Sequence, residues 1–185
     1  MRRADLLREG HAVSLADMLL AREQRAARLA CYPGPLISFT LVAPGPVKDN
    51  RMWRKVAARA RDAVVALCQE KGWASEEVFR IEASSGAEWI RTVCAPAEEV
   101  KRALVALEQH HPLGRLWDLD TIDETGRALS RRALGLADRL CLICDREAHL
   151  CARARTHSLE LLLDDVARRI ENDERNDKGE SAESA

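Results

Sequence analysis

The sequence has few aromatic residues and no surplus of positive charge. Aromatic side chains make up 4% of the 185 residues, which leaves little to stack on nucleic-acid bases. Lys and Arg total 29 against 30 Asp and Glu, whereas a general nucleic-acid binder needs a basic excess. No apolar run approaches the roughly 20 residues of a membrane helix. The composition therefore argues against a nucleic-acid partner and against a membrane protein.

We also expect no secretory signal, because the first residues lead into polar sequence rather than an apolar core. We therefore expect a cytoplasmic protein whose six cysteines stay reduced. Cys31, Cys68 and Cys94 occur singly in apolar surroundings and are interpreted as small buried hydrophobic residues. An apolar fraction of 46% is enough for a packed core.

The acidic residues are concentrated at the C-terminus. Residues 171–185 carry six acids and two bases and almost no apolar residue, which predicts a disordered acidic tail. We predict one domain over residues 1–170, with a core at 36–122 and a C-terminal segment at 127–170.

The pattern of apolar residues and turn signals predicts an α+β protein. A helix at 14–31 precedes an alternation of strands and helices. The predicted strands are 36–42, 78–83, 88–93 and 116–122, and the intervening helices are 50–71 and 97–110. The order βαββαβ is the ferredoxin-like pattern, here with an N-terminal helix and a C-terminal Cys/His knuckle plus helix. We expect two helices to cover one sheet face and the polar face to stay open.

Two aspartates on the last predicted strand are the strongest chemical signal. Asp118 and Asp120 are two residues apart, so their side chains point the same way. They can converge on Mg²⁺, which prefers oxygen ligands, and they are the candidate catalytic residues. In the usual strand order Ser38 and Thr40 would lie beside them. The alternative is a pair of solvated carboxylates at a sheet edge.

Basic residues near this strand are candidates for binding phosphate. Lys48 follows a proline-rich turn at a strand-to-helix junction, where free N–H groups favour anions. Arg115, Arg131 and Arg132 flank the aspartates, and arginine binds phosphate in a bidentate manner. Ser38 completes the predicted phosphate-binding set. A rigid turn and a solvated basic surface are the alternatives. His110 and His111 are candidate general bases or simple helix-end caps.

A third signal is the spacing C-x₂-C-x₆-C-x₅-H formed by Cys141, Cys144, Cys151 and His157. These residues have the type and number of a closed structural zinc site. His149 is an alternative fourth ligand, and unligated thiols are the alternative to a metal.

Several long blocks resemble one protein family. They are Leu36 to Asp49 (LISFTLVAPGPVKD), His111 to Asp120 (HPLGRLWDLD), Leu129 to Arg132 (LSRR) and the cysteine segment from Cys141 to His157. In order and content they resemble the citrate lyase holo-acyl-carrier-protein synthases, also called apo-citrate lyase phosphoribosyl-dephospho-CoA transferases. The resemblance covers about residues 10–165.

The resemblance implies a nucleotidyltransferase-type reaction. Such enzymes transfer 2′-(5″-phosphoribosyl)-3′-dephospho-CoA from its 5″-triphosphate, triphosphoribosyl-dephospho-CoA, to a serine of the citrate lyase acyl carrier (gamma) subunit, and pyrophosphate leaves. A carboxylate pair with Mg²⁺ and nearby basic groups suits displacement at a phosphate. Two alternatives stay open: the equivalent transferase for the malonate decarboxylase carrier, and a non-catalytic adaptor for a carrier protein.

Overall fold

A computed structural model describes residues 2–183 of the chain, with side chains up to residue 177. The fold is α+β and is built on one four-stranded sheet in which all neighbouring strands are antiparallel, in the order β2-β3-β1-β4. The strands are β1 (Leu36–Leu41), β2 (Ser75–Ala83), β3 (Gly86–Val93) and β4 (Trp117–Ile122). All four predicted strands are therefore present.

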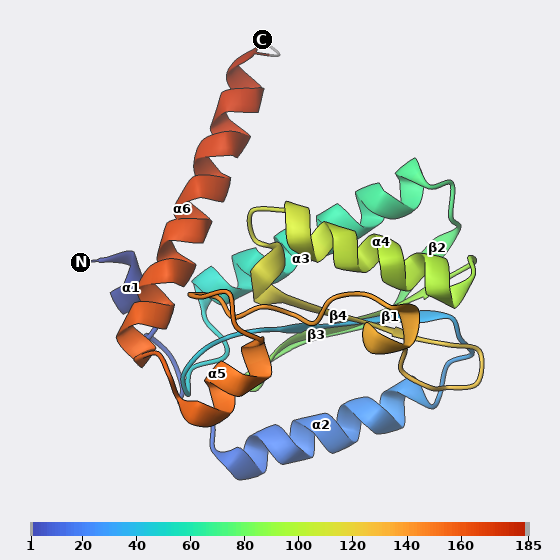
Figure 1. The fold of residues 1–185 in the computed structure, drawn as a ribbon, viewed down its shortest axis with the longest axis horizontal. Helices are drawn as coiled ribbons and strands as arrows, with labels where there is room; N and C mark the ends of the chain where they lie inside the picture. The colour runs from blue at the N-terminus through green and yellow to red at the C-terminus, as the bar shows by residue number, and fades with distance from the viewer. Residues whose placement is uncertain (1, 184–185) are drawn as a thin grey trace.

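The helices precede, connect and follow these strands (Figure 1). They are α1 (Arg3–Leu6), α2 (Leu15–Leu29), α3 (Arg51–Glu70), α4 (Ala97–His110), α5 (Ala148–Ala154) and α6 (Leu159–Glu183), with the short 3₁₀ turns η1 (Gly114–Leu116) and η2 (Arg132–Leu134). No helix in the described part of the chain combines the length and apolarity needed to cross a membrane.

The main core lies between the sheet and the two helices α3 and α4, which cover the same face (Figure 1). The alternate residues Ile37 and Phe39 of β1 are fully buried there because successive strand side chains point to opposite faces. The rings of Phe39 and Trp89 stack with centroids 4.9 Å apart. Trp117 donates its indole N–H to the carbonyl of Val56 at 3.2 Å, which ties β4 to α3.

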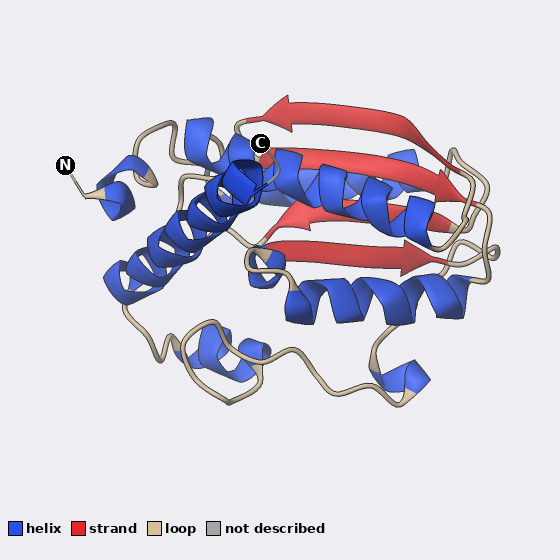
Figure 2. Cartoon of the chain, turned by 90° about the horizontal axis from the view of Figure 1, so that it is seen from above, coloured by secondary structure: helices blue, strands red, loops and turns tan. Residues whose placement is uncertain are grey.

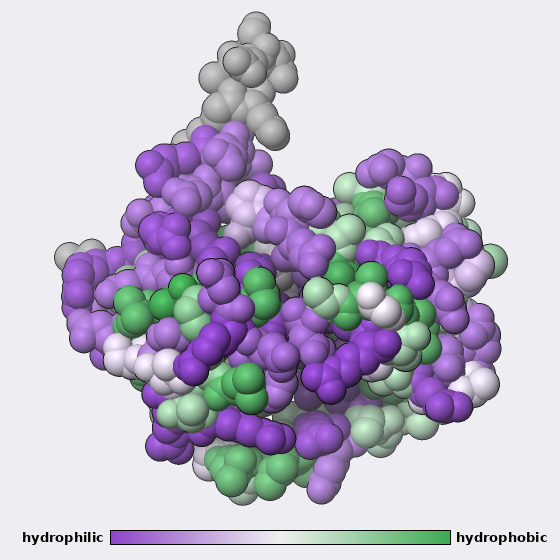
Figure 3. All heavy atoms as spheres, viewed as in Figure 1, coloured by the Kyte–Doolittle hydropathy of each residue, from purple (hydrophilic) through white to green (hydrophobic). Residues whose placement is uncertain are grey.

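The second sheet face, predicted to be open, is instead crossed by α2 (Figure 1). Arg28 of α2 donates to Glu88 of β3 at 3.1 Å and lies over the ring of Phe79. No residue of α2 is buried, so polar contacts and a few partly buried side chains hold the helix on the sheet. Leu15 and Leu19 are 77% and 51% exposed, and Figure 3 shows apolar surface where α2 begins.

The C-terminal helix differs from its prediction. Residues 171–177 lie within α6 rather than in a disordered tail. Their acidic side chains pair with basic groups elsewhere in the chain: Glu174 with Arg3 at 2.7 Å, and Asp173 with Arg59 at 3.1 Å. This complementary charge, which composition alone does not reveal, accounts for the difference. Residues 184 and 185 of the predicted tail lie outside the described residues.

Candidate active site

The sheet brings the predicted carboxylates beside the predicted β1 residues. In the antiparallel pairing of β1 with β4, Ser38 is opposite Asp120 and Thr40 is opposite Asp118. Opposite residues of a strand pair project to the same face, so all four side chains face the α2 side of the sheet. The two carboxylates are about half exposed, at 50% and 55%, whereas Ser38 is buried.

Each carboxylate forms an ion pair with a basic side chain. Asp118 Oδ1 lies 3.3 Å from Arg139, and Asp120 Oδ1 lies 3.5 Å from the nearly buried Lys101. Partial burial, and next the charge of Asp120, raise the pKa of Asp118. Both ion pairs use Oδ1, which leaves Oδ2 of each carboxylate directed at no basic partner among the described contacts.

The same basic residues cover the free edge of β4. Lys101 donates to the carbonyl of Leu119 at 3.0 Å, and Arg139 donates to the carbonyl of Trp117. The N–H of Leu119 donates to Glu108 Oε1 at 2.8 Å. An exposed strand edge otherwise offers unpaired backbone groups to other chains. Charged side chains of α4 and of the segment after β4 therefore complete the edge on which the carboxylates lie.

Glu108 organises this edge from the C-terminal end of α4. It is buried and pairs with Arg131 and, at 3.7 Å, with Arg139. Burial, the largest influence, raises the pKa of Glu108, while the two arginines act in the opposite direction. The backbone at Gly114 lies so close to Glu108 that only glycine fits there, since a Cβ on Gly114 would lie 2.5 Å from the carbonyl oxygen of Glu108.

The predicted phosphate-binding arginines differ in how their charges are used. Arg115 donates to the carbonyls of Leu140 and Cys141, and no carboxylate among the described residues forms an ion pair with it. Burial and the nearby Arg169 and Arg139 lower its pKa, so this guanidinium lies in an electropositive place. Arg131, by contrast, pairs with Glu108.

Arg132 is 72% exposed and pairs with Asp138 at 2.7 Å. Its charge is therefore already neutralised at the surface.

Lys48 lies away from these arginines, in a pocket between α2 and the sheet. Arg25 of α2, Thr40 of β1 and Glu88 of β3 also line this pocket. Lys48 donates to the carbonyl of Ala43, and burial lowers its pKa. A second pocket is lined by Glu108, Gln109, Arg115, Arg131, Asp138, Arg139 and Leu140. Of the predicted phosphate-binding residues, Lys48 thus lines one pocket and Arg115 and Arg131 line the other, whereas Arg132 and Ser38 line neither of the two. The strand pair carrying Thr40 and Asp118 lies between the pockets.

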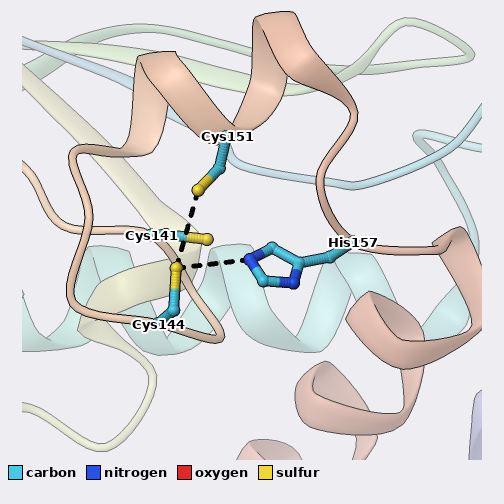
Figure 4. A group of neighbouring side chains, drawn as sticks. All are labelled: Cys141, Cys144, Cys151 and His157. Atoms are coloured by element: carbon cyan, nitrogen blue, oxygen red, sulfur yellow. Dashed lines mark hydrogen bonds between the residues drawn. The ribbon is translucent and has the colours of Figure 1, made fainter.

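The predicted metal ligands of the C-terminal segment converge. The ligand atoms of Cys141, Cys144, Cys151 and His157 all lie within 4.8 Å of one another, and Figure 4 shows the side chains directed at a common centre. The backbone N–H of Arg146 and the His157 ring lower the pKa of Cys144 to about 6.

The solitary cysteines fit their interpretation only in part. Cys68 is buried, as expected, but Cys31 and Cys94 are exposed. Both follow the end of an element, α2 or β3, where the chain turns toward the surface.

Sequence reasoning missed most of the charged partners of the site. Lys101 and Glu108 lie seven residues apart, so they share one face of α4, and both are buried. That spacing was a usable signal, because two charges on the buried side of a helix require partners. No local feature of the sequence marks Arg25 or Arg139 as a charged partner of the site.

The two histidines do not reach the carboxylates. The His111 ring packs on Trp117, which is on the opposite sheet face, and His110 contacts its own helix at the Ala106 carbonyl.

Comparisons with known proteins agree on one family. A family model described as apo-citrate lyase phosphoribosyl-dephospho-CoA transferase matches residues 13–173. A protein of that name from Escherichia coli O139:H28 (strain E24377A / ETEC) is 42% identical over 167 residues, which cover 84% of this chain and 91% of the relative. Proteins of the same name from Shigella boydii serotype 18 (strain CDC 3083-94 / BS512) and Escherichia coli O157:H7 (strain EC4115 / EHEC) match with the same identity and coverage.

Proposed function

Because this chain belongs to the apo-citrate lyase phosphoribosyl-dephospho-CoA transferase family, we propose that it modifies the acyl carrier (gamma) subunit of citrate lyase. The enzyme transfers 2′-(5″-phosphoribosyl)-3′-dephospho-CoA from triphosphoribosyl-dephospho-CoA to a carrier serine. The serine oxygen forms a bond to the phosphorus next to the ribose, the bond from that phosphorus to pyrophosphate breaks, and the serine proton passes to a base. The similarity over most of the chain carries this proposal.

Asp118 and Asp120 are the proposed catalytic residues. They are half exposed on one sheet face, and Oδ2 of each is open to a cation. Oxygen donors on adjacent same-face positions suit Mg²⁺, which would neutralise charge on the donor phosphates as pyrophosphate leaves. Burial, and next the charge of Asp120, raise the pKa of Asp118, which supports this role because a bound cation would stabilise a carboxylate that is partly desolvated and lies beside a like charge.

Lys48 and Arg115 are the strongest candidates for binding the triphosphate. Neither forms an ion pair with a described carboxylate, and each lines a pocket on one side of the carboxylate strand. Arg131 and Arg132 are weaker candidates because each is already paired with a carboxylate. Ser38 is buried beneath the same face and contributes by shaping it.

The arrangement is best described as ferredoxin-like. Support comes from the element order βαββαβ and from the strand order β2-β3-β1-β4, in which the first strand lies between the third and fourth. The proposed site is then on the sheet face away from α3 and α4. We propose a cytoplasmic location, where the donor and the carrier would be available.

Incubation of the apo carrier with this protein, the donor and Mg²⁺ tests the proposal. Intact-mass analysis should show a carrier that has gained one prosthetic group, and pyrophosphate should appear in equal amount. The same assay with the malonate decarboxylase carrier distinguishes the sister reaction. An unmodified citrate lyase carrier beside a modified malonate decarboxylase carrier would assign the alternative substrate. No modification of either would contradict the transferase proposal and favour a non-catalytic adaptor.

A further inference from the structure

The cysteine cluster has the dimensions of a metal site and not those of a disulfide. Cys144 Sγ lies 3.6 Å from Cys151 Sγ and 3.3 Å from Nε2 of His157. A disulfide would require an S–S distance of about 2.05 Å. A tetrahedral zinc ion, with Zn–S about 2.3 Å and Zn–N about 2.0 Å, places its ligand atoms about 3.8 Å (S to S) and about 3.5 Å (S to N) apart. These two distances are close to those of the tetrahedron, and all four ligand atoms lie within 4.8 Å of one another.

The segment that carries these ligands has little structure of its own. Figure 2 shows the chain between β4 and α6 mostly as loop, interrupted by the short elements η2 and α5. Leu140 and Leu150 are 43% and 48% exposed, and the other leucines and the isoleucine of the segment are only partly buried. Cys141 and Cys151, however, are buried. The cysteines thus occupy the centre of a segment that lacks an apolar core, which is where a metal stabilises a small fold.

Backbone contacts bring the four ligands together from three places. Cys141 and Cys144 belong to a turn closed by the hydrogen bond from the Cys141 N–H to the Arg146 carbonyl at 2.7 Å. Cys151 lies on α5, and His157 lies just before α6 (Figure 4). Arg146 also donates to the Thr156 hydroxyl at 2.8 Å, which holds the turn against the residue before His157.

We propose that Cys141, Cys144, Cys151 and His157 bind one structural Zn²⁺ ion. Three thiolates and an imidazole are soft and borderline donors that favour zinc over hard cations such as Mg²⁺. Four protein ligands fill a tetrahedral shell and leave no open position for a substrate or water, so the ion stabilises the segment and takes no part in the reaction.

The zinc ion also anchors residues of the candidate active site. Arg139 is two residues before the ligand Cys141, and it contacts Asp118 and the carbonyls of Arg115 and Trp117. Arg115 in turn donates to the carbonyl of Cys141. Loss of the ion would therefore release Arg139 and Arg115 from the edge of β4. This consequence rests on the proposed function, whereas the zinc site itself does not.

Metal analysis of the full-length protein purified without chelator tests the site. We expect about one zinc ion per chain in the wild type and in Cys94→Ser, a control that removes an exposed cysteine outside the cluster. Cys144→Ser and Cys151→Ser should each lose the zinc. If these variants do not fold, zinc is instead removed from the wild type by a chelator and then added back. Removal should lower the melting temperature, and addition should restore it.

The possible results are separable. A wild type without stoichiometric metal, or with iron in place of zinc, overturns the assignment, as does a disulfide between Cys144 and Cys151 detected by mass. Zinc content and melting temperature do not depend on transfer, so a zinc protein that fails to modify any carrier would contradict only the proposed function. A metal-free protein with full transfer activity would contradict only the zinc site. Donor affinity that is unchanged after zinc removal would overturn the anchoring of Arg139 and Arg115.

Discussion

Replacement of Asp118 by Asn separates catalysis from stability, because the structure predicts a large effect on transfer and a small effect on stability. The variant keeps the size of the side chain and removes its charge. If Asp118 helps to hold Mg²⁺ at the donor phosphates, the rate of transfer should fall at least about 100-fold, which is the typical effect of losing one preorganised electrostatic contact in a transition state. Asp120→Asn should act in the same direction.

Stability should change little in Asp118→Asn. The lost ion pair with Arg139 is half exposed on the carboxylate side, and such pairs contribute about 0–1 kcal/mol. The raised pKa of Asp118 acts against this loss. The folded protein holds the proton more tightly than the unfolded chain, so ionisation of Asp118 lowers the free energy of unfolding as the pH rises through the raised pKa. The neutral variant lacks that penalty.

The assay combines initial rates of carrier modification, by intact mass at saturating Mg²⁺, with urea denaturation at several pH values. Asp62→Asn, at an exposed position on α3, is the matched control. Relative to wild type, the stability of Asp118→Asn should increase from low pH up to the raised pKa and then stay level. Near-normal transfer by both Asp118→Asn and Asp120→Asn would refute the catalytic role. A large loss of stability in Asp118→Asn would indicate a structural role instead.

Three further predictions concern the surroundings of the carboxylates. Lys48→Ala and Arg115→Ala should each weaken donor binding by about 1.5–3 kcal/mol, the range for charged hydrogen bonds; calorimetry measures this, with the exposed Arg80→Ala as control, and unchanged affinity in both variants would count against the phosphate-binding assignment. Gly114→Ala should lower the free energy of unfolding by about 1–3 kcal/mol, because its Cβ would overlap the carbonyl of Glu108; equal urea midpoints would show that the turn adapts. Glu108→Gln keeps an acceptor for the Leu119 N–H but removes the carboxylate that pairs with Arg131 and Arg139. It should lower the free energy of unfolding by about 1–3 kcal/mol and raise the KM for the donor. A variant with wild-type stability and KM would contradict this role of Glu108.

The alternation of side chains made the sheet and its carboxylate face predictable from sequence. Ser38, Thr40, Asp118 and Asp120 alternate with apolar residues, and a one-residue slip of either strand would turn its apolar set away from the core. The observed register places the polar residues of both strands on one face and the apolar residues in the core. The convergence of the cysteines and His157 was also predictable. Ligand type and short spacing, like the alternation of a strand, are local features of the sequence.

Contacts between distant parts of the chain were not predictable in this way. The pattern of 14–31 predicted a helix but not the sheet face that it crosses, because few of its side chains are tightly packed. The acidic stretch after residue 170 indicated disorder by its composition, yet its described part continues α6 and pairs with Arg3 and Arg59. Composition counts charges and does not reveal which of them meet.

The candidate active site depends on both ends of the chain. The strands supply the carboxylates and α4 supplies Lys101, but further positive charge that acts on Asp118 comes from outside the region 36–122: Arg139 from the segment after β4 and Arg25 from the N-terminal helix α2. The region 36–122 alone would supply Lys101, which pairs with Asp120, and the candidate triphosphate-binding residues Lys48 and Arg115, but it would lack Arg139, which pairs with Asp118. A triphosphate needs several positive groups, and the flanking segments add to those of the core. The family match begins at residue 13, before α2, and ends at residue 173, within α6. Its extent thus includes both flanking segments that this arrangement of charge requires.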